Sequence, residues 1–549
     1  MLTLLGEGMT ETTRCRVIAC ALFAVWLVVV VCTVWSHAVW RDEVRALSKA
    51  LDGQNVLAML KGLRIEGHPA VWYLLLRGAH TLLPRPQVLQ VVALLVAAAS
   101  VLLLLLYSPF RWGMKALLLA GNMFLFEYSV IARNYGITAL LLFLLAIFYK
   151  RHKDRGPLLG ILLLLLANCN APSVLLVGGF LLFWLADITT EDQANRSRAI
   201  RTFGWNAAIA ILGVALCALT IMPASHPAPV AAARPGNALP LPSRAVLPPG
   251  MELRPLLKAA VLPGAKFERL MAISAHYVSS PDDPPSVLSS LLLSAILFGS
   301  TLGLIRYPGA FLAALGTLIG FSIFFRLFYP GSYRHEALWL SFLIASYWIT
   351  TGKGSALESR IPLRLQPLLR SISDTGWGFF VLLMGIQVLI GVTNVMAAAG
   401  DGPPFSCSRD LGALIGSRPD LRDATIIADP ELLLESLPYY VSNPTYLMRE
   451  QRFGRFVSPD KATFRLTLDD VLANARRLRT ETNKPVLVLL PYPLDPLAPF
   501  AQTRIIREFH GLEFVITPEQ VRAFTNATQL IESYPAALTD ENFDVYLLK

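Results

Sequence analysis

Long apolar runs recur along the chain from its N-terminus to about residue 398, and then they stop. Their lengths approach the ~20 residues with which an α-helix crosses the ~30 Å hydrocarbon core of a membrane. Of the 549 residues, 54% are hydrophobic and 16% are charged, a composition that excludes a soluble enzyme of this length. We therefore predict a polytopic α-helical membrane part, residues 1–400, followed by a soluble tail, residues 401–549.

Eleven apolar segments are predicted to be crossings, several of them as short cores whose helices extend further. The apolar stretch 70–83 is not counted, because it contains Arg77 and His80 and its ~20 Å of helix is marginal for a crossing. We expect it to be a surface-lying helix. The predicted spans are 17–34, 88–106, 117–130, 137–149, 158–166, 173–185, 203–222, 287–304, 310–325, 337–349 and 377–395.

With eleven crossings, the Lys and Arg residues of the short loops gather on one side, as in K-R-H-K-D-R at 150–155 and R-S-R-A-I-R at 196–201. The positive-inside rule makes that side cytoplasmic. This placement also accounts for the net charge of +10, so we do not expect nucleic acid as a partner. The first helix has no small-residue cleavage site and is expected to be retained. The predicted location is a bacterial inner membrane, with a cytoplasmic N-terminus and a periplasmic tail.

The predicted outer face carries two long loops. Loop 37–86 should hold surface helices, and the Pro- and Ala-rich loop 223–285 should hold short surface helices at 256–262 and 267–276. In the tail, short strands alternate with amphipathic helices, which predicts a small α/β domain with a parallel-leaning sheet. Its expected strands are 424–428, 486–490, 513–516 and 543–548, and its expected helices are 431–440 and 468–478, the first beginning at Asp429-Pro430-Glu431.

Some chemistries lack support in the sequence. The tail has no G-x-G-x-x-G after its first strand and no P-loop lysine motif, so nucleotide binding is not indicated. The six cysteines show no paired spacing, which argues against a disulfide framework or a zinc site.

Three polar clusters fall on the predicted outer face, where charged groups cost energy unless they have partners or a function. They are Trp40-Arg41-Asp42-Glu43 with Glu66-Gly67-His68-Pro69, the segment 127–135, and the segment 326–336. Structural roles are the alternatives: interfacial solvation for Asp42 and a helix cap for His68 in the first cluster, and snorkelling for Arg133 and Arg334 in the other two.

Three motifs together resemble the GT-C superfamily of membrane glycosyltransferases, most closely its protein-mannosyltransferase and aminoarabinose-transferase-like branch. They are W-R-D-E at 40–43, E-G-H-P-A-V-W-Y-L-L-L at 66–76 and A-R-N-Y-G at 132–136. The resemblance covers roughly residues 15–190 and the later helices only in outline. The chain departs from the pattern at Ala70, where a second proline is usual, and at Arg133-Asn134-Tyr135, where some relatives place an acidic residue. The second departure leaves open whether a divalent metal takes part.

The resemblance implies that Asp42 is the general base, with Glu43 as an alternative or helper. The base would deprotonate an acceptor hydroxyl that attacks C1 of a sugar carried on a polyprenyl phosphate, with inversion at C1. Arg133 and Arg334 suit the phosphate, because guanidinium stays charged and forks toward phosphate oxygens. Further residues predicted at the phosphate are Tyr135, Tyr333 and His335, and those predicted around the acceptor or Asp42 are Glu66, His68, Trp40 and Arg41. A metal site formed by Asp42, Glu43 and His68 is an alternative, but the spacing of these residues does not support it.

The expected function is therefore transfer of one sugar from a polyprenyl-phosphate donor to a glycan or glycolipid acceptor. The main alternative is a transporter or flippase for a lipid-linked glycan. Transporters place polar residues near the bilayer midplane and often contain internal repeats, whereas these spans are nearly free of charge and show no repeat. A third interpretation is that the tail is a receptor or scaffold domain and the membrane part only anchors it. Anchoring needs far fewer than eleven helices, which argues against this interpretation.

Overall fold

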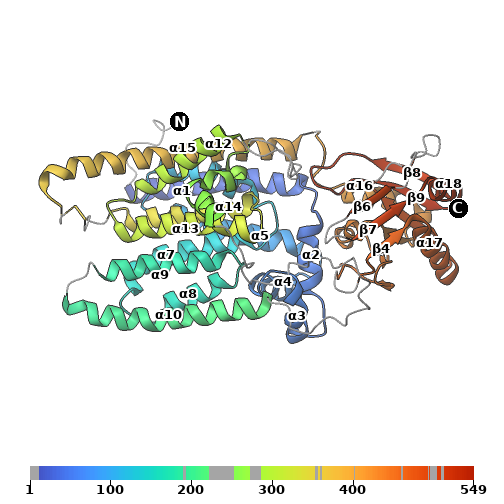
Figure 1. Ribbon diagram of the computed structural model, residues 1–549, viewed down its shortest axis with the longest axis horizontal. Coiled ribbons are helices and arrows are strands. Elements are labelled where there is room, and N and C mark those ends of the chain that lie inside the picture. Colours follow the sequence, from blue (N-terminus) through green and yellow to red (C-terminus); the bar gives the residue numbers. More distant parts are fainter. Residues whose placement is uncertain are drawn as a thin grey trace.

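The computed structural model describes residues 11–189, 193–221, 253–272, 286–352, 357–358, 361–400, 402–458, 462–491, 494, 504–507 and 512–549. Helices of the membrane part run side by side along the long axis of the molecule, and the tail adjoins one end of this bundle (Figure 1). Six of the described helices are long and apolar enough to cross a membrane, and three shorter apolar helices accompany them. The chain thus has the helices of a multi-pass membrane protein, while the count of eleven crossings and their sidedness stay predictions.

All but one of the predicted spans coincide, to within two residues at their C-terminal ends, with part of one continuous helix. The exception is 117–130, where the helix stops at Gly121 and a short π-helical turn, η3 (Met123–Glu127), replaces its second half. The helices of the bundle are α1 (Glu11–Ser36), α5 (Val88–Tyr107), α6 (Trp112–Ala120), α7 (Tyr135–His152), α8 (Leu158–Ala167), α9 (Ser173–Ile188), α10 (Gln193–Ile221), α12 (Val287–Leu302), α13 (Pro308–Leu327), α14 (Tyr333–Thr350) and α15 (Gln366–Ala399), which the short turn η6 (Leu363–Leu365) precedes.

Short helices lie across one end of the bundle, between it and the tail (Figure 1). They are α2 (Arg41–Ala50), α3 (Val56–Gly62), the turn η2 (Leu63–Ile65) and α4 (Val71–Leu82). Helix α4 is the predicted helix of the stretch 70–83; its 12 residues span ~18 Å, too little for a crossing. We call the end of the bundle that carries these helices the tail end.

The segment before α12 is partly exposed, as predicted for surface helices: Leu257 and Val261 of its helix are exposed, whereas Phe267 and Leu270 are fully buried. The helix predicted at 267–276 is a 3-10 turn in its described part. Helix α11 (Leu253–Val261) and the 3-10 turns η4 (Pro263–Lys266) and η5 (Glu268–Met271) pack among α12, α13 and α14. A Cβ on Gly264 would lie 2.3 Å from the Ser290 carbonyl oxygen, so glycine permits the contact. The remainder of the loop, 223–252 and 273–285, lies outside the described residues.

Glycines also allow α12 and α15 to touch. A Cβ on Gly376 would lie 2.0 Å from the backbone nitrogen of Gly303, whereas a Cβ on Gly378, two residues along α15, would meet nothing within 4 Å. We expect Gly376→Ala to lower the free energy of unfolding by about 1–3 kcal/mol, because backbone atoms cannot move aside as a side chain can. Gly378→Ala should leave stability unchanged or raise it by up to about 1 kcal/mol. Thermal unfolding in detergent compares the two; equal melting temperatures would contradict the close contact.

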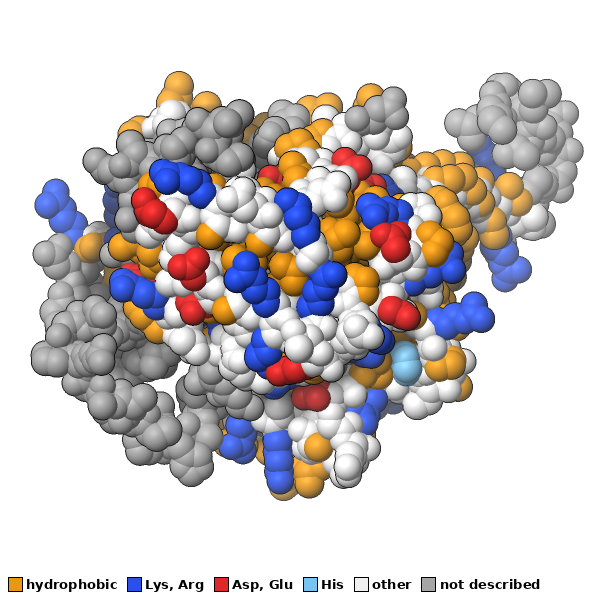
Figure 2. Space-filling model, turned by 90° about the vertical axis from the view of Figure 1, so that its right-hand side faces the viewer, with side chains coloured by type: hydrophobic (Ala, Val, Ile, Leu, Met, Phe, Trp, Pro, Cys, Tyr) orange, Lys and Arg blue, Asp and Glu red, His pale blue; other side chains and the backbone are white. Residues whose placement is uncertain are grey.

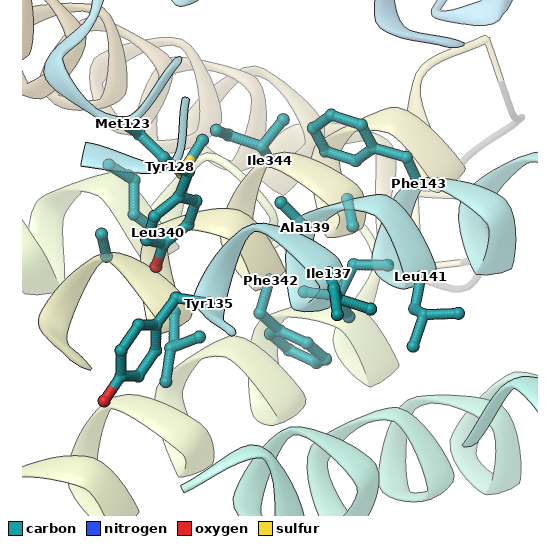
Figure 3. Packing of buried hydrophobic residues seen from close by; sticks show 14 of the residues in the cluster. Met123, Tyr128, Tyr135, Ile137, Ala139, Leu141, Phe143, Leu340, Phe342 and Ile344 are labelled. Carbon is teal, nitrogen blue, oxygen red and sulfur yellow. The ribbon is translucent and has the colours of Figure 1, made fainter. Parts of the chain in front are cut away.

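Helix α14 is the central helix of the bundle. All its residues from Tyr333 to Thr350 are buried, as expected for a helix that is apolar all round. Figure 3 shows side chains of α7 and α14 packed together along the bundle, with Tyr128 and Tyr135 at one end of the packed group. The Tyr128 hydroxyl donates to the carbonyl oxygen of Arg334 at 2.9 Å. The apolar packing of α7 on α14 therefore fixes the position of the polar residues that begin α14.

The tail contains the predicted strands, but its sheets are mixed and not mainly parallel. One sheet has the order β1-β5-β9-β8 and the other β4-β7-β6, with parallel pairing only for β1–β5 and β4–β7 among the described strands. The short connection from β8 to β9 forces antiparallel pairing. The strands are β1 (Thr425–Ala428), β2 (Tyr446–Leu447), β3 (Arg452–Phe453), β4 (Arg465–Thr467), β5 (Val486–Leu490), β6 (Arg504–Arg507), β7 (Glu513–Ile516), β8 (Thr528–Tyr534) and β9 (Phe543–Leu548).

The helix predicted at 431–440 is wrong: two 3-10 turns, η8 (Glu431–Leu434) and η9 (Leu437–Tyr439), stand there. Pro438 lacks the backbone N–H that a continuous helix needs. The second predicted helix, 468–478, is confirmed as part of α17 (Leu468–Thr482). The remaining elements are α16 (Ser408–Ser417), η7 (Pro419–Leu421) and α18 (Pro518–Ala527). Viewed from the tail end, basic and acidic side chains are interspersed with apolar ones (Figure 2), as on a surface that faces water.

Candidate functional site

Helix α2 presents its first residues in different directions. It begins at Arg41, after the extended residue Trp40, and the Glu43 side chain accepts a hydrogen bond from the Trp40 N–H at 3.1 Å. Successive residues of a helix point ~100° apart. Arg41, Asp42 and Glu43 consequently face three different neighbours, and only Asp42 faces the arginines of the other polar clusters.

Arg133 and Arg334 converge on Asp42. Asp42 Oδ2 lies 3.3 Å from Arg334 Nη2 and 3.6 Å from Arg133 Nη1. The two arginines come from the segment that leads into α7 and from the first turn of α14, respectively. We call them the arginine pair. The structure thus brings together the predicted base and both predicted phosphate-binding residues; their chemical roles stay predictions.

The arginine pair keeps Asp42 ionised. Burial alone would raise the pKa of Asp42, but the charges of Arg133, Arg334 and Arg41 outweigh it and hold the pKa well below its usual range. The Asp42 side chain is 28% exposed. It is therefore a charged carboxylate that water can reach, set beside two guanidinium groups.

Neutral groups hold each member of the arginine pair. Arg133 donates to the carbonyl oxygen of Asp42 and, over 3.2 Å, to His68 Nε2. Burial and the Arg133 charge lower the pKa of His68 to about 3, so His68 is uncharged and can accept this bond. Arg334 lies over the Trp40 ring, 5.6 Å from its centroid, and donates to Ser332 Oγ at 3.3 Å. The sequence predicted His68 and Trp40 at the site, and they hold its arginines.

The other residues predicted at the phosphate divide into two groups. His335 Nδ1 accepts from the backbone N–H of Ser332 at 3.2 Å, and its Nε2 lies 2.8 Å from the Tyr135 hydroxyl. These two side chains flank the arginine pair. Tyr333 points away from it, because its hydroxyl donates to Gln387 Oε1 on α15 at 2.5 Å.

Glu43 lies apart from Asp42 in a closed network. Its side chain is fully buried, with Oε2 3.0 Å from His37 Nε2 and Oε1 accepting from the Ala132 N–H at 2.7 Å. Both oxygens are engaged, and neither faces the arginine pair. This arrangement does not favour the predicted catalytic role of Glu43; instead, its bond to Ala132 fixes the segment that presents Arg133.

Glu66 likewise contacts Arg45 and Lys49 of α2 rather than Asp42. It accepts two hydrogen bonds from Arg45, at 2.9 and 2.8 Å, and Lys49 Nζ lies 2.9 Å from its Oε1. Together with Arg41, these two basic residues are spaced four apart, which puts them on one face of α2. That spacing is visible in the sequence and could have identified this face, but the sequence analysis missed it.

The tail supplies acidic partners to the same face of α2. Asp540 pairs with the Arg41 side chain, Glu541 accepts from the Arg41 N–H at 2.6 Å, and Glu435 pairs with Arg45. Burial raises the pKa of Glu435. The tail is thus docked on the helix that carries Asp42, and these three carboxylates, far away in sequence, were missed by sequence reasoning.

The docking of the tail should depend on pH through Glu541. Burial raises the pKa of Glu541 to about 7 from 4.5, so the folded protein holds a proton that the unfolded chain releases between those values. Stability is therefore lost as the pH rises from about 5 to 8. Glu541→Gln lacks this titration. We therefore expect the free energy of unfolding of the variant, relative to that of the unmodified chain, to rise by about 2–3 kcal/mol between pH 5 and pH 8, since one pKa unit corresponds to roughly 1.4 kcal/mol. Thermal unfolding of both proteins at about pH 5 and about pH 8 measures this change. The same difference in stability between the two proteins at both pH values would contradict the prediction.

A cleft lies beside the arginine pair, between the tail, α14 and α15. It is small, with about 60 Å³ of space that water can occupy. Its polar wall includes Asn122 and Asn394, which are hydrogen-bonded to each other at 2.8 Å. Ser332, which accepts from Arg334, also lines it. The cleft and the arginine pair therefore share a wall.

The described residues do not form an evident metal centre. No group of three His, Cys, Asp or Glu side chains is placed to hold an ion in the part of the chain that the structure describes. In the alternative set of Asp42, Glu43 and His68, Glu43 is turned to Ala132 and His37, and His68 accepts from Arg133. These residues do not fit a common ion, and no step below passes through one.

The comparisons with known proteins add no relative. No family model, no curated protein and no solved structure matches this chain.

Proposed function

We propose that this chain is a GT-C-like membrane glycosyltransferase. It moves one sugar from a polyprenyl-phosphate donor to a glycan or glycolipid acceptor at the outer face of a bacterial inner membrane. The observation that supports this most is the convergence of Arg133 and Arg334 on Asp42 Oδ2. Such a cluster provides a base and two oxyanion-binding groups within reach of one substrate.

In the proposed reaction, the Asp42 carboxylate accepts the proton of the acceptor hydroxyl while the hydroxyl oxygen forms a bond to C1 of the sugar. The bond between C1 and the phosphate oxygen breaks, and its electron pair leaves with the polyprenyl phosphate. Arg133 and Arg334 offset the negative charge that accumulates on this leaving group. Because one in-line displacement takes place, the configuration at C1 inverts.

The cleft between the tail, α14 and α15 is proposed to receive the first isoprene unit of the donor, next to its phosphate. Ile390, Ala397 and Ala398 of α15 contribute apolar surface, and Ser332 marks the end beside Arg334. Arg334 itself does not line the cleft, so the link between this apolar wall and the arginine pair is its hydrogen bond to Ser332. The tail, which is docked on α2, would close the site on the side of the acceptor.

A transfer assay in membranes tests the proposal. Vesicles from cells that make the chain and from cells that lack it receive a polyprenyl-phosphate sugar labelled in the sugar. We expect label to reach a glycan or glycolipid only where the chain is present, with one polyprenyl phosphate released per sugar moved. If the chain instead carries the intact donor from one leaflet to the other without releasing polyprenyl phosphate, it is a transporter and the proposal fails.

A further inference from the structure

Two guanidinium groups share one carboxylate oxygen, and both contacts to it are long. Asp42 Oδ2 lies 3.3 Å from Arg334 Nη2 and 3.6 Å from Arg133 Nη1, and Oδ1 lies 3.9 Å from Arg41 Nε. Well-formed hydrogen bonds between guanidinium and carboxylate measure ~2.7–2.9 Å. Asp42 therefore accepts one long hydrogen bond from Arg334 and otherwise acts as a counter-ion of the arginine pair, not as its bidentate partner.

Each member of the arginine pair also has contacts that do not involve the Asp42 carboxylate. Arg133 is held by the Asp42 carbonyl oxygen and His68, and Arg334 by Ser332 and the ring of Trp40. These partners are uncharged, so they leave the positive charge of both groups in place. If the carboxylate turned away, the two guanidinium groups would remain oriented for another anion.

The carboxylate is the most accessible member of the cluster. The Asp42 side chain is 28% exposed, whereas those of Arg133 and Arg334 are 11% and 8% exposed. Asp42 lies in the first turn of α2, where a change of side-chain rotamer needs no change of the backbone. An incoming anion can thus take its place from the open side of the cluster.

We propose that the donor phosphate and the Asp42 carboxylate compete for the arginine pair, so that donor binding displaces the carboxylate and frees it to act as the base. This inference rests on the proposed function and names a regulation of the same site. A phosphodiester has two free oxygens and one negative charge, which suits two guanidinium groups that already point to one position. The base becomes effective only when the donor is present.

The competition predicts that anion binding and protonation of Asp42 favour each other, and this can be measured. Without a donor, the arginine charges hold the pKa of Asp42 below its usual range; an anion that occupies the pair weakens this effect, so Asp42 gains affinity for protons. By reciprocity, neutralising Asp42 tightens anion binding by the same factor. The charged and titratable groups that face Asp42 are Arg41 on α2, Arg133 before α7, Arg334 and His335 on α14, and His68 before α4.

Binding of a soluble donor analogue tests this. The probe is geranyl methyl phosphate, a prenyl phosphodiester with no titrating group of its own between pH 4 and 8, and calorimetry measures its binding to the full chain in detergent. We expect Asp42→Asn to bind it at least about tenfold tighter, the effect of removing one charge at ~4–6 Å. The unmodified chain should take up protons on binding near pH 4–5, and Asp42→Asn should take up none.

Two controls separate the competition from general electrostatics. Asp540→Asn removes the same charge from a 51% exposed aspartate that pairs with Arg41 and not with the arginine pair, and it should change affinity by less than about twofold. Geraniol, which lacks the phosphate, should bind equally to the unmodified chain and to Asp42→Asn. Unchanged or weaker phosphodiester binding by Asp42→Asn, or no proton uptake by the unmodified chain, would overturn the inference.

The inference and the proposed function can fail separately. If sugar transfer occurs but Asp42→Asn binds the probe no more tightly, the competition is wrong and the glycosyltransferase remains. If Asp42→Asn binds more tightly while the unmodified chain transfers no sugar in the vesicle assay, the anion exchange stands and the proposed reaction is wrong.

Discussion

Replacing Asp42 by Asn is expected to lower kcat for sugar transfer by about 10²–10⁴-fold, the usual contribution of a positioned general base. Asn has nearly the shape of Asp but cannot accept the proton of the acceptor hydroxyl. The side chain is partly exposed at the start of α2, so the fold should tolerate the change. Initial rates at saturating donor and acceptor measure the loss, and thermal unfolding verifies that the variant is folded.

The matched control for this substitution is Asp52→Asn. Asp52 is an exposed carboxylate two residues beyond the end of α2. It carries the same charge as Asp42 but does not contact the arginine pair. We expect its removal to change kcat by less than about twofold. Substantial turnover by Asp42→Asn would leave Asp42 as a counter-ion only and would require another base.

Replacing Arg334 by Ala is expected to lower kcat/KM for the lipid donor by about 10²–10³-fold. This corresponds to ~2–4 kcal/mol of stabilisation of the leaving phosphate. Arg334→Lys should recover part of the loss, since lysine keeps the charge but has neither the planar fork nor the stacking on Trp40. Arg133→Ala should show a loss of similar size, because Arg133 faces the same oxygen of Asp42.

Arg64→Ala is the control for the loss of an arginine. Arg64 is exposed in the turn η2, between α3 and α4, and lies outside the cluster. Its removal should change kcat/KM by less than about twofold. If Arg133→Ala and Arg334→Ala both used the donor as well as the unmodified chain does, the phosphate would have to bind elsewhere.

Much of the fold could be predicted because its signals are local. Apolar runs locate the bundle helices, although α10 and α15 begin about ten residues before the predicted spans. Alternating short runs locate strands such as β5 and β9. The errors arise where one residue breaks a pattern. Gly121 ends α6 early, and Pro438 divides a predicted helix of the tail. The buried position of Gly264 was not predictable either, since it depends on Ser290 of another helix.

The site was predictable in composition but not in its connections. Asp42 directly follows the first apolar helix, and Arg133 and Arg334 stand out because they fall on the predicted outer face, where the positive-inside rule disfavours basic residues. Nothing in the sequence shows that Glu43 turns toward Ala132, or that Asp540, Glu541 and Glu435 of the tail bind the arginines of α2. These contacts join residues as much as 500 positions apart.

The sequence by itself determined that this chain is built of membrane-length helices with a polar tail, because hydrophobic length and periodicity are properties of each segment alone. Only the tertiary structure decided which charges meet. A side chain's direction depends on the helix face it occupies and on the neighbour packed there, so Asp42 faces two arginines while Glu43, one residue later, faces the interior.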